Sequence, residues 1–85
     1  MNISFSKSAI DDLKSIKEYY QKQGVSQIGQ DFVVAIVEHI ETLSAHPYIG
    51  RAVPEFNDDS IRELIHSPFR VVYFCESESV NIIRV

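Results

Sequence analysis

Hydrophobic positions at the start of the chain change from an alternating to a helical spacing. Ile3 and Phe5 alternate with polar residues, which indicates a short strand. Apolar side chains then recur three or four positions apart, at Ala9, Ile10, Leu13, Ile16 and Tyr20. This spacing predicts an amphipathic helix from about Lys7 to Gln23.

Residues at both ends of this helix have the preferences expected of helix termini. Ser6 or Ser8 supplies the N-cap, and Ser8 with Asp11 has the spacing of a capping box. Gly24 follows the last apolar position, and glycine readily adopts the left-handed conformation that often ends a helix. We therefore expect the chain to turn at Gly24.

A second apolar stripe begins a few residues later and is wider than the first. Its members are Ile28, Phe32, Ala35, Ile36, Ile40 and Leu43, with Val33 and Val37 beside them. Ser26 is the expected N-cap, and Pro47 prevents continuation, so this helix should run from Ser26 to about Ala45. A stripe of this width predicts contacts with two neighbours, the first helix and a sheet.

The last part of the chain has the pattern of short antiparallel strands. They follow a loop of turn-forming residues and cover Ile61 to His66, Phe69 to Cys75 and Val80 to Val85. Their short connections suit hairpins. The predicted order is β-α-α-β-β-β, an α+β fold in which a helical hairpin packs on a small, mostly antiparallel four-stranded sheet. We expect residues 1–85 to form a single domain, and a last strand ending at Val85 to leave an unpaired sheet edge.

Composition restricts the class of protein further. The 85 residues are 45% hydrophobic and 24% charged, which is typical of an ordinary globular domain with a small core. The chain has no signal-peptide pattern and no apolar run of membrane-spanning length, so we expect a cytoplasmic protein without membrane contact. The single cysteine, Cys75, lies among apolar residues and is expected to be buried.

The arginines are the first candidate for function. The net charge of −4 disfavours general phosphate binding, but Arg62, Arg70 and Arg84 occupy one predicted strand each. Neighbouring strands lie about 4.8 Å apart, so these guanidinium groups converge on one sheet face if the registers agree. Such a cluster would bind phosphate or carboxylate. The alternative is that they are solvated and paired with glutamates such as Glu63, and the sequence leaves both interpretations open.

Other candidates for chemistry are weaker. Glu55, in the loop before the strands, would act as a general base only if burial or a neighbour shifted its pKa. A solvated Glu55 is the favoured interpretation. His66 lies next to a predicted hairpin turn and is favoured as a solvated edge residue over an acid or base. The spacing of the histidines does not place two ligands on one helix turn, so we expect no metal site and no cofactor. A glycine-rich phosphate loop and a nucleophile elbow are both missing, so no small-molecule substrate is expected.

Taken in order along nearly the whole chain, these features resemble the RelE/ParE superfamily of bacterial toxins, and the ParE branch most closely. The resemblance is carried by Ser6, Ala9, Asp12, Leu13, Ile16 and Tyr19, by Phe32, Ile36, Ile40 and Leu43, by the P-x-x-G-R pattern of Pro47, Gly50 and Arg51, by R-E-L from Arg62 and by F-R-V-V-Y from Phe69. It implies the toxin of a type II toxin–antitoxin system, neutralised by a cognate antitoxin whose C-terminal segment wraps the toxin.

The resemblance also implies one of two mechanisms. ParE-like toxins bind and inhibit DNA gyrase, and here the target-binding residues would be Arg51, Arg62, Arg70 and Arg84. RelE-like toxins are endoribonucleases that cut messenger RNA on the ribosome. In that scheme Arg70 matches a strand arginine and Glu55 falls near a loop carboxylate.

One departure from the family pattern decides the order of these expectations. The sequence ends at Val85, where the family usually continues with a short tail that carries His, Arg or Tyr. Without that tail, cleavage would lack an acid and part of its charge stabilisation. We therefore expect a non-enzymatic gyrase inhibitor first, a ribosome-dependent endoribonuclease second, and a truncated, inactive toxin that only binds antitoxin third.

Overall fold

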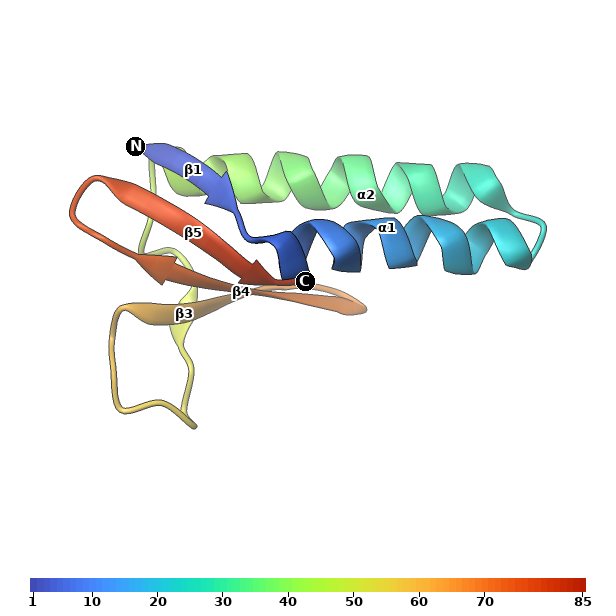
Figure 1. Ribbon diagram of the computed structural model, residues 1–85. Helices are drawn as coiled ribbons and strands as arrows, with labels where there is room; N and C mark the ends of the chain where they lie inside the picture. Colours follow the sequence, from blue (N-terminus) through green and yellow to red (C-terminus); the bar gives the residue numbers. More distant parts are fainter.

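A helical hairpin lies on one face of a five-stranded sheet in the computed structural model, which describes residues 1–85 (Figure 1). The elements are β1 (Asn2–Phe5), α1 (Lys7–Lys22), α2 (Ser26–Glu41), a 3₁₀ turn (Thr42–Ser44), β2 (Arg51–Ala52), β3 (Ile61–His66), β4 (Phe69–Cys75) and β5 (Ser79–Arg84). The strand order is β1-β5-β4-β3-β2. All neighbouring strands are antiparallel except β1 and β5, which are parallel.

The predicted α+β class and the order of helices and strands are confirmed, but two details of the sheet were wrong. The sheet has five strands rather than four, because the two residues of β2 pair with Glu63 and Arg62 of β3. Two residues are too few to produce a recognisable alternation. The expected free edge at the last strand is also wrong, because β1 pairs with β5 and makes it an interior strand.

Helix α1 begins where the sequence predicted, but only one of the two candidate caps is used. The Ser6 hydroxyl accepts a hydrogen bond from the backbone N–H of Ala9 at 3.0 Å. Ser8 lies inside the first turn, so the predicted capping box is wrong. Gly24 has a φ of 78°, the left-handed conformation expected at this helix end.

Helix α2 begins without the predicted cap. Its N-cap residue is Val25, which makes no side-chain capping bond, and Ser26 is already the first helical residue. The helix then tightens into the 3₁₀ turn and ends at Ala45, as the following proline required. The α2 start therefore depends on packing against α1 rather than on a capping side chain.

The core lies between α2, the start of α1 and the inner face of the sheet. Its fully or almost fully buried members are Ala9, Ile36, Ile40, Leu43, Leu64, Val71, Tyr73, Cys75, Val80 and Ile82. Alternate residues of β4 belong to this set, as expected of a strand with one buried face. Each fully buried large apolar side chain contributes about 1.5–3 kcal/mol, so this set drives folding. The buried Cys75 and the α2 stripe from Phe32 to Leu43 are thereby confirmed, whereas Ile28 at the start of the predicted stripe is exposed.

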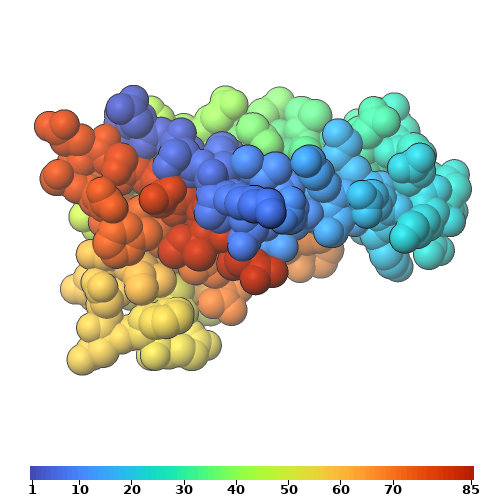
Figure 2. All heavy atoms as spheres, in the orientation of Figure 1, coloured from blue at the N-terminus to red at the C-terminus, as the bar shows by residue number.

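Aromatic side chains join the hairpin to the sheet at the β3–β4 turn. The ring of Phe32 lies 5.4 Å from that of Tyr20 and 5.2 Å from that of Phe69, between ring centres. Beyond this contact the distal half of the hairpin projects past the sheet (Figures 1 and 2). The molecule is consequently elongated, with extents of 41 × 25 × 21 Å. Tyr19 and Ile28 on this half are largely exposed.

Gly50 is required where the chain enters β2. Its N–H donates a hydrogen bond to the Tyr73 hydroxyl at 3.0 Å, which satisfies a polar group in the core. A Cβ atom at Gly50 would overlap the carbonyl oxygen of Glu63 and stand 2.6 Å from the Tyr73 hydroxyl. Burial raises the pKa of Tyr73, so the hydroxyl stays protonated at neutral pH.

We predict that Gly50→Ala lowers the free energy of unfolding by about 3 kcal/mol, because the neighbours are strand backbone and a core ring that cannot move aside. Gly24→Ala is the matched control. It meets no atom within 4 Å, so backbone strain alone costs about 1 kcal/mol. Urea unfolding measures the free energy of unfolding of both variants. Equal losses of stability in the two variants would contradict the steric argument.

Candidate functional site

The register of β3 and β4 decides on which face of the sheet each arginine lies. Arg62 stands opposite Tyr73, which belongs to the core under the helices, whereas Arg70 stands opposite Ile65. Because successive strand residues point to opposite faces, Arg62 lies on the helix side and Arg70 on the outer face. Of the two interpretations that the sequence left open, the convergence of Arg62, Arg70 and Arg84 on one face is therefore excluded.

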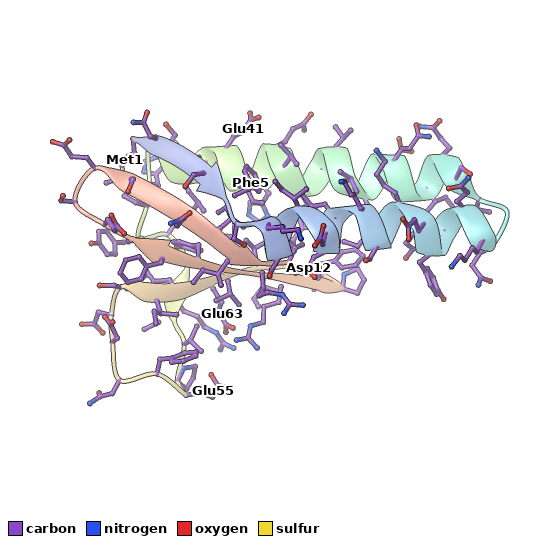
Figure 3. All side chains as sticks on the ribbon, viewed as in Figure 1. Met1, Phe5, Asp12, Glu41, Glu55 and Glu63 are labelled. Atoms are coloured by element: carbon purple, nitrogen blue, oxygen red, sulfur yellow. The ribbon has the colours of Figure 1, made fainter.

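Two arginines do meet, on the outer face, and a glutamate joins them. The Nε of Arg51 pairs with Oε1 of Glu63, and the Nε of Arg70 pairs with Oε2. Glu63 lies in the middle because its β3 position is paired with Arg51 on one side and Val72 on the other. Figure 3 shows Glu63 on the side of the sheet away from the helices. We call Arg51, Glu63 and Arg70 the Glu63 cluster.

Exposure within the Glu63 cluster is strongly asymmetric. The Glu63 side chain is 2% exposed, whereas the side chains of Arg51 and Arg70 are 69% and 47% exposed. Each guanidinium uses Nε towards Glu63, and its terminal amino groups make no hydrogen bond within the protein, so they remain available as donors. The cluster thus presents two positioned cationic groups and a net charge of about +1 on an acidic protein. The half-exposed Ile65 lies beside it, so the surface is both charged and apolar.

Arg62 has a different role on the helix side. Its Nε donates to the Gly50 carbonyl at 2.9 Å and its Nη1 donates to the Asp59 carbonyl at 3.0 Å. The guanidinium carbon also lies 5.1 Å from the centre of the Tyr48 ring, a cation–π contact. Arg62 therefore holds the loop between α2 and β3 in place.

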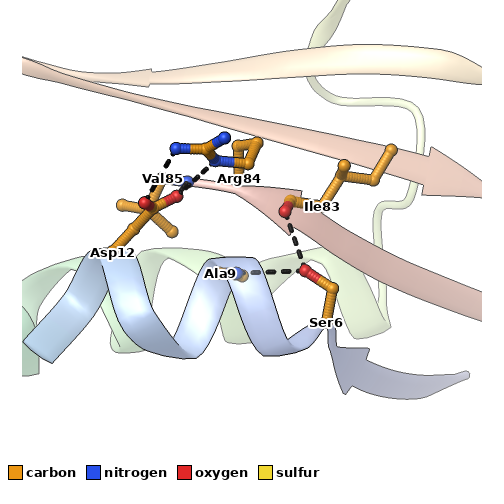
Figure 4. A network of polar contacts seen from close by, with 6 residues as sticks. All are labelled: Ser6, Ala9, Asp12, Ile83, Arg84 and Val85. Carbon is orange, nitrogen blue, oxygen red and sulfur yellow. Dashed lines mark hydrogen bonds and ion pairs between the residues drawn. The ribbon is translucent and has the colours of Figure 1, made fainter.

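Arg84 is bound to α1 rather than directed towards the other arginines (Figure 4). Its Nε and Nη2 donate to the two carboxylate oxygens of Asp12 at 2.7 and 3.0 Å, and the Val85 N–H donates to the same carboxylate at 3.0 Å. Nearby, the Ser6 hydroxyl donates to the Ile83 carbonyl at 2.8 Å. The hydrogen bond from Arg84 lowers the pKa of Asp12, and the same contact raises the pKa of Arg84. These bonds fasten the end of β5 to the helix.

A groove opens beside this attachment, between α1 and the β3–β4 turn. Its volume is ≈ 430 Å³, and it is lined by Asp12, Ser15, Ile16, Tyr19, Tyr20, Pro68, Phe69 and Val85. The lining is mostly aromatic and apolar, with the Asp12 carboxylate as its acidic group. A groove of this composition suits the apolar side chains of a partner peptide.

Glu55 does not join the arginines. It lies in the exposed loop before β3, at the Ile61 end of the strand, whereas Arg70 stands opposite Ile65 at the other end. Four strand residues span about 13 Å. Figure 3 accordingly shows Glu55 at the far end of the loop, well away from Glu63. The two candidate nuclease residues are not brought together.

His66 also differs from its expected setting. It is half-buried on the helix side of the sheet and hydrogen-bonded to His39 of α2, so the solvated edge position was wrong. No group of three or more His, Cys, Asp or Glu side chains is arranged to hold a metal ion. Neither helix has the length and apolar character needed to cross a membrane.

Comparison with known proteins identifies the class to which this fold belongs. The chain is similar in structure to a chain described as the chromosomal ParDE TA system from P. aeruginosa, with a TM-score of 0.82 and 22% sequence identity over 99% of this chain and 91% of that one. No curated protein matches the sequence. The likeness to that chain shows a shared fold, with two helices packed on a five-stranded sheet.

The family follows from the sequence. Residues 3–85 match the family described as the ParE toxin of the type II toxin–antitoxin system, parDE. The chain therefore belongs to the ParE toxin family. The resemblance seen in the sequence is confirmed, and within the superfamily it is the ParE branch that matches.

We predict that the contribution of Asp12 to stability depends on pH. Its folded-state pKa lies below the usual 3.8 because Arg84 donates to it. The contribution is therefore complete above the unfolded pKa and is lost as the pH falls through the lower folded value. In urea unfolding from pH 7 to pH 2.5, the stability difference between wild type and Asp12→Asn should be constant above about pH 5 and shrink below about pH 4. Asp11→Asn, at an exposed position one residue away, is the control. A stability difference between wild type and Asp12→Asn that stays unchanged down to pH 2.5 would contradict a stabilising ion pair between Asp12 and Arg84.

We also predict non-additive costs within the Glu63 cluster. Arg51→Ala and Arg70→Ala should each cost less than about 1 kcal/mol, since the other arginine still neutralises the buried carboxylate. The double variant leaves Glu63 buried without a cation and should cost clearly more than the sum of the single losses. Urea unfolding of the four proteins gives the coupling energy, and additive losses would contradict the argument that either arginine alone can neutralise Glu63.

Proposed function

We propose that this ParE-family toxin acts by binding and inhibiting DNA gyrase, without cleaving a substrate, and that a cognate antitoxin neutralises it. The Glu63 cluster is the observation that carries the proposal. Arginines with free amino donors, fixed in position next to apolar side chains, are typical of the residues that dominate protein–protein interfaces. The buried Glu63 fixes both guanidinium groups before any partner arrives, which reduces the entropy lost on binding.

A binding mechanism also agrees with the separation of the candidate catalytic groups. In-line cleavage of RNA needs a base, an acid and charge stabilisation around one phosphate. Glu55 and Arg70 lie at opposite ends of β3, and His66 lies on the other face of the sheet. No observation here favours the endoribonuclease, so it serves as an alternative outcome of the experiment.

The antitoxin is proposed to cover apolar surface that the toxin leaves open. The groove between α1 and the β3–β4 turn has room for apolar side chains of a peptide. The projecting hairpin adds exposed Tyr19, Val25 and Ile28 along its length. A segment that buried this surface would gain hydrophobic free energy in proportion to the area covered. Gyrase and antitoxin are both intracellular partners, so the proposal includes action in the cytoplasm.

The test is a supercoiling assay with gyrase and the purified toxin. We expect inhibition by the wild type, and a loss of potency of at least about tenfold for Arg51→Ala with Arg70→Ala, because two anchoring cations are removed. Lys14→Ala with Lys22→Ala is the control, since it removes the same charge from exposed positions of α1. Equal loss in both double variants would indicate a general charge effect instead of a specific surface.

The alternatives give different results in the same preparations. Messenger cleavage in a translating extract, abolished by Arg70→Ala and by Glu55→Gln while supercoiling is unaffected, would replace the proposal with the endoribonuclease. A folded protein without effect in either assay, but still bound by its antitoxin, would identify an inactive toxin.

A further inference from the structure

Two histidines from distant parts of the chain meet on the helix side of the sheet. His39 lies in the last turn of α2 and His66 at the end of β3, and their Nδ1 atoms are 3.0 Å apart. The ring centres are 5.2 Å apart. Neither ring makes another hydrogen bond within the protein, and both are half-buried. Because the pair lies on the helix side of the sheet, it is on the opposite face from the Glu63 cluster.

We propose that His39 and His66 form a chelating site for a divalent transition-metal ion of the Zn²⁺, Cu²⁺ or Ni²⁺ class. Imidazole nitrogens bind these ions at about 2.0–2.1 Å. Two such bonds at angles between 90° and tetrahedral place the nitrogens roughly 2.9–3.4 Å apart. The separation of the two Nδ1 atoms, 3.0 Å, falls in this interval.

The surroundings of the pair favour a cation. The C-terminal end of a helix carries a partial negative charge, and His39 lies in the last turn of α2. Glu38 and Glu41 flank it on the same helix, which contains neither Lys nor Arg. The nearest arginine along β3, Arg62, already donates to Gly50 and Asp59. The local field thus supports a positive ion.

Binding requires only a small rearrangement of the pair. Without metal, one ring donates its Nδ1–H to the other. With metal, both Nδ1 lone pairs bind the ion, and the displaced proton moves to Nε2 of the same ring, so both imidazoles remain neutral. Water fills the remaining coordination positions. Because α2 and β3 supply one ligand each, the ion joins the helical layer to the sheet.

Titration calorimetry with ZnCl₂ on a chain without a polyhistidine tag tests the site. We expect one ion per chain, and affinity at least about tenfold weaker in His39→Gln and in His66→Gln. His46→Gln is the matched control, since His46 is exposed and belongs to no pair, and it should bind as the wild type does.

Two further measurements separate loss of ligands from loss of fold. Electron paramagnetic resonance of the Cu²⁺ form should show splitting from two imidazole nitrogens, reduced to one in either Gln variant of the pair. Zinc should also raise the melting temperature of the wild type but not of the double Gln variant. No saturable binding up to about 1 mM zinc, or binding that His39→Gln leaves unchanged, would reduce the pair to a hydrogen bond. The supercoiling assay does not depend on these histidines, so the two proposals fail independently.

Discussion

The pairing of β3 with β4 is the constraint on which the rest of this structure depends. In this register Leu64 stands opposite Val71, and Tyr73 stands opposite Arg62. Leu64, Val71 and Tyr73 therefore all face the helices. A shift of one residue would turn the core side chains of one strand to solvent and is therefore strongly disfavoured. The same register places Glu63 and Arg70 on the outer face and brings Arg51 to them through β2. The arrangement of the candidate site is thus a consequence of how the core is packed.

Glu63 illustrates how burial and position combine at this site. A buried carboxylate is costly unless cations or hydrogen bonds compensate it, and two arginines do so here. In exchange the carboxylate holds two long, flexible side chains that would otherwise lose conformational entropy on meeting a partner. A patch of net positive charge is maintained in this way on a protein whose total charge is −4.

Most of the fold was predictable from the chain, and most of the site geometry was not. Long apolar periodicities predicted both helices and the strands β3, β4 and β5, because each covers several turns or several alternations, and the alternation of Ile3 and Phe5 with polar residues predicted β1. Strand β2 was not predicted, because its two residues are too few to show the alternation of a strand. The convergence of the arginines depended on register, and Phe69 to Cys75 is apolar on both faces, so the sequence could not show which way Arg70 points. Arg84 was misplaced because its partner, Asp12, is 72 positions away. The histidine pair joins two elements 27 positions apart and has no local signal at all.

The parallel pairing of β1 with β5 has a consequence for how the protein folds during synthesis. The interior strand β5 is the last strand in sequence order, and it lies between β4 and β1, the first strand in sequence order. Until β5 emerges, β1 has no neighbour to pair with and the helices have only part of a surface to cover. The sheet is therefore complete only after β5 has been made, and the pairing of β1 with β5 joins residues 77 positions apart, a non-local contact that favours slow folding.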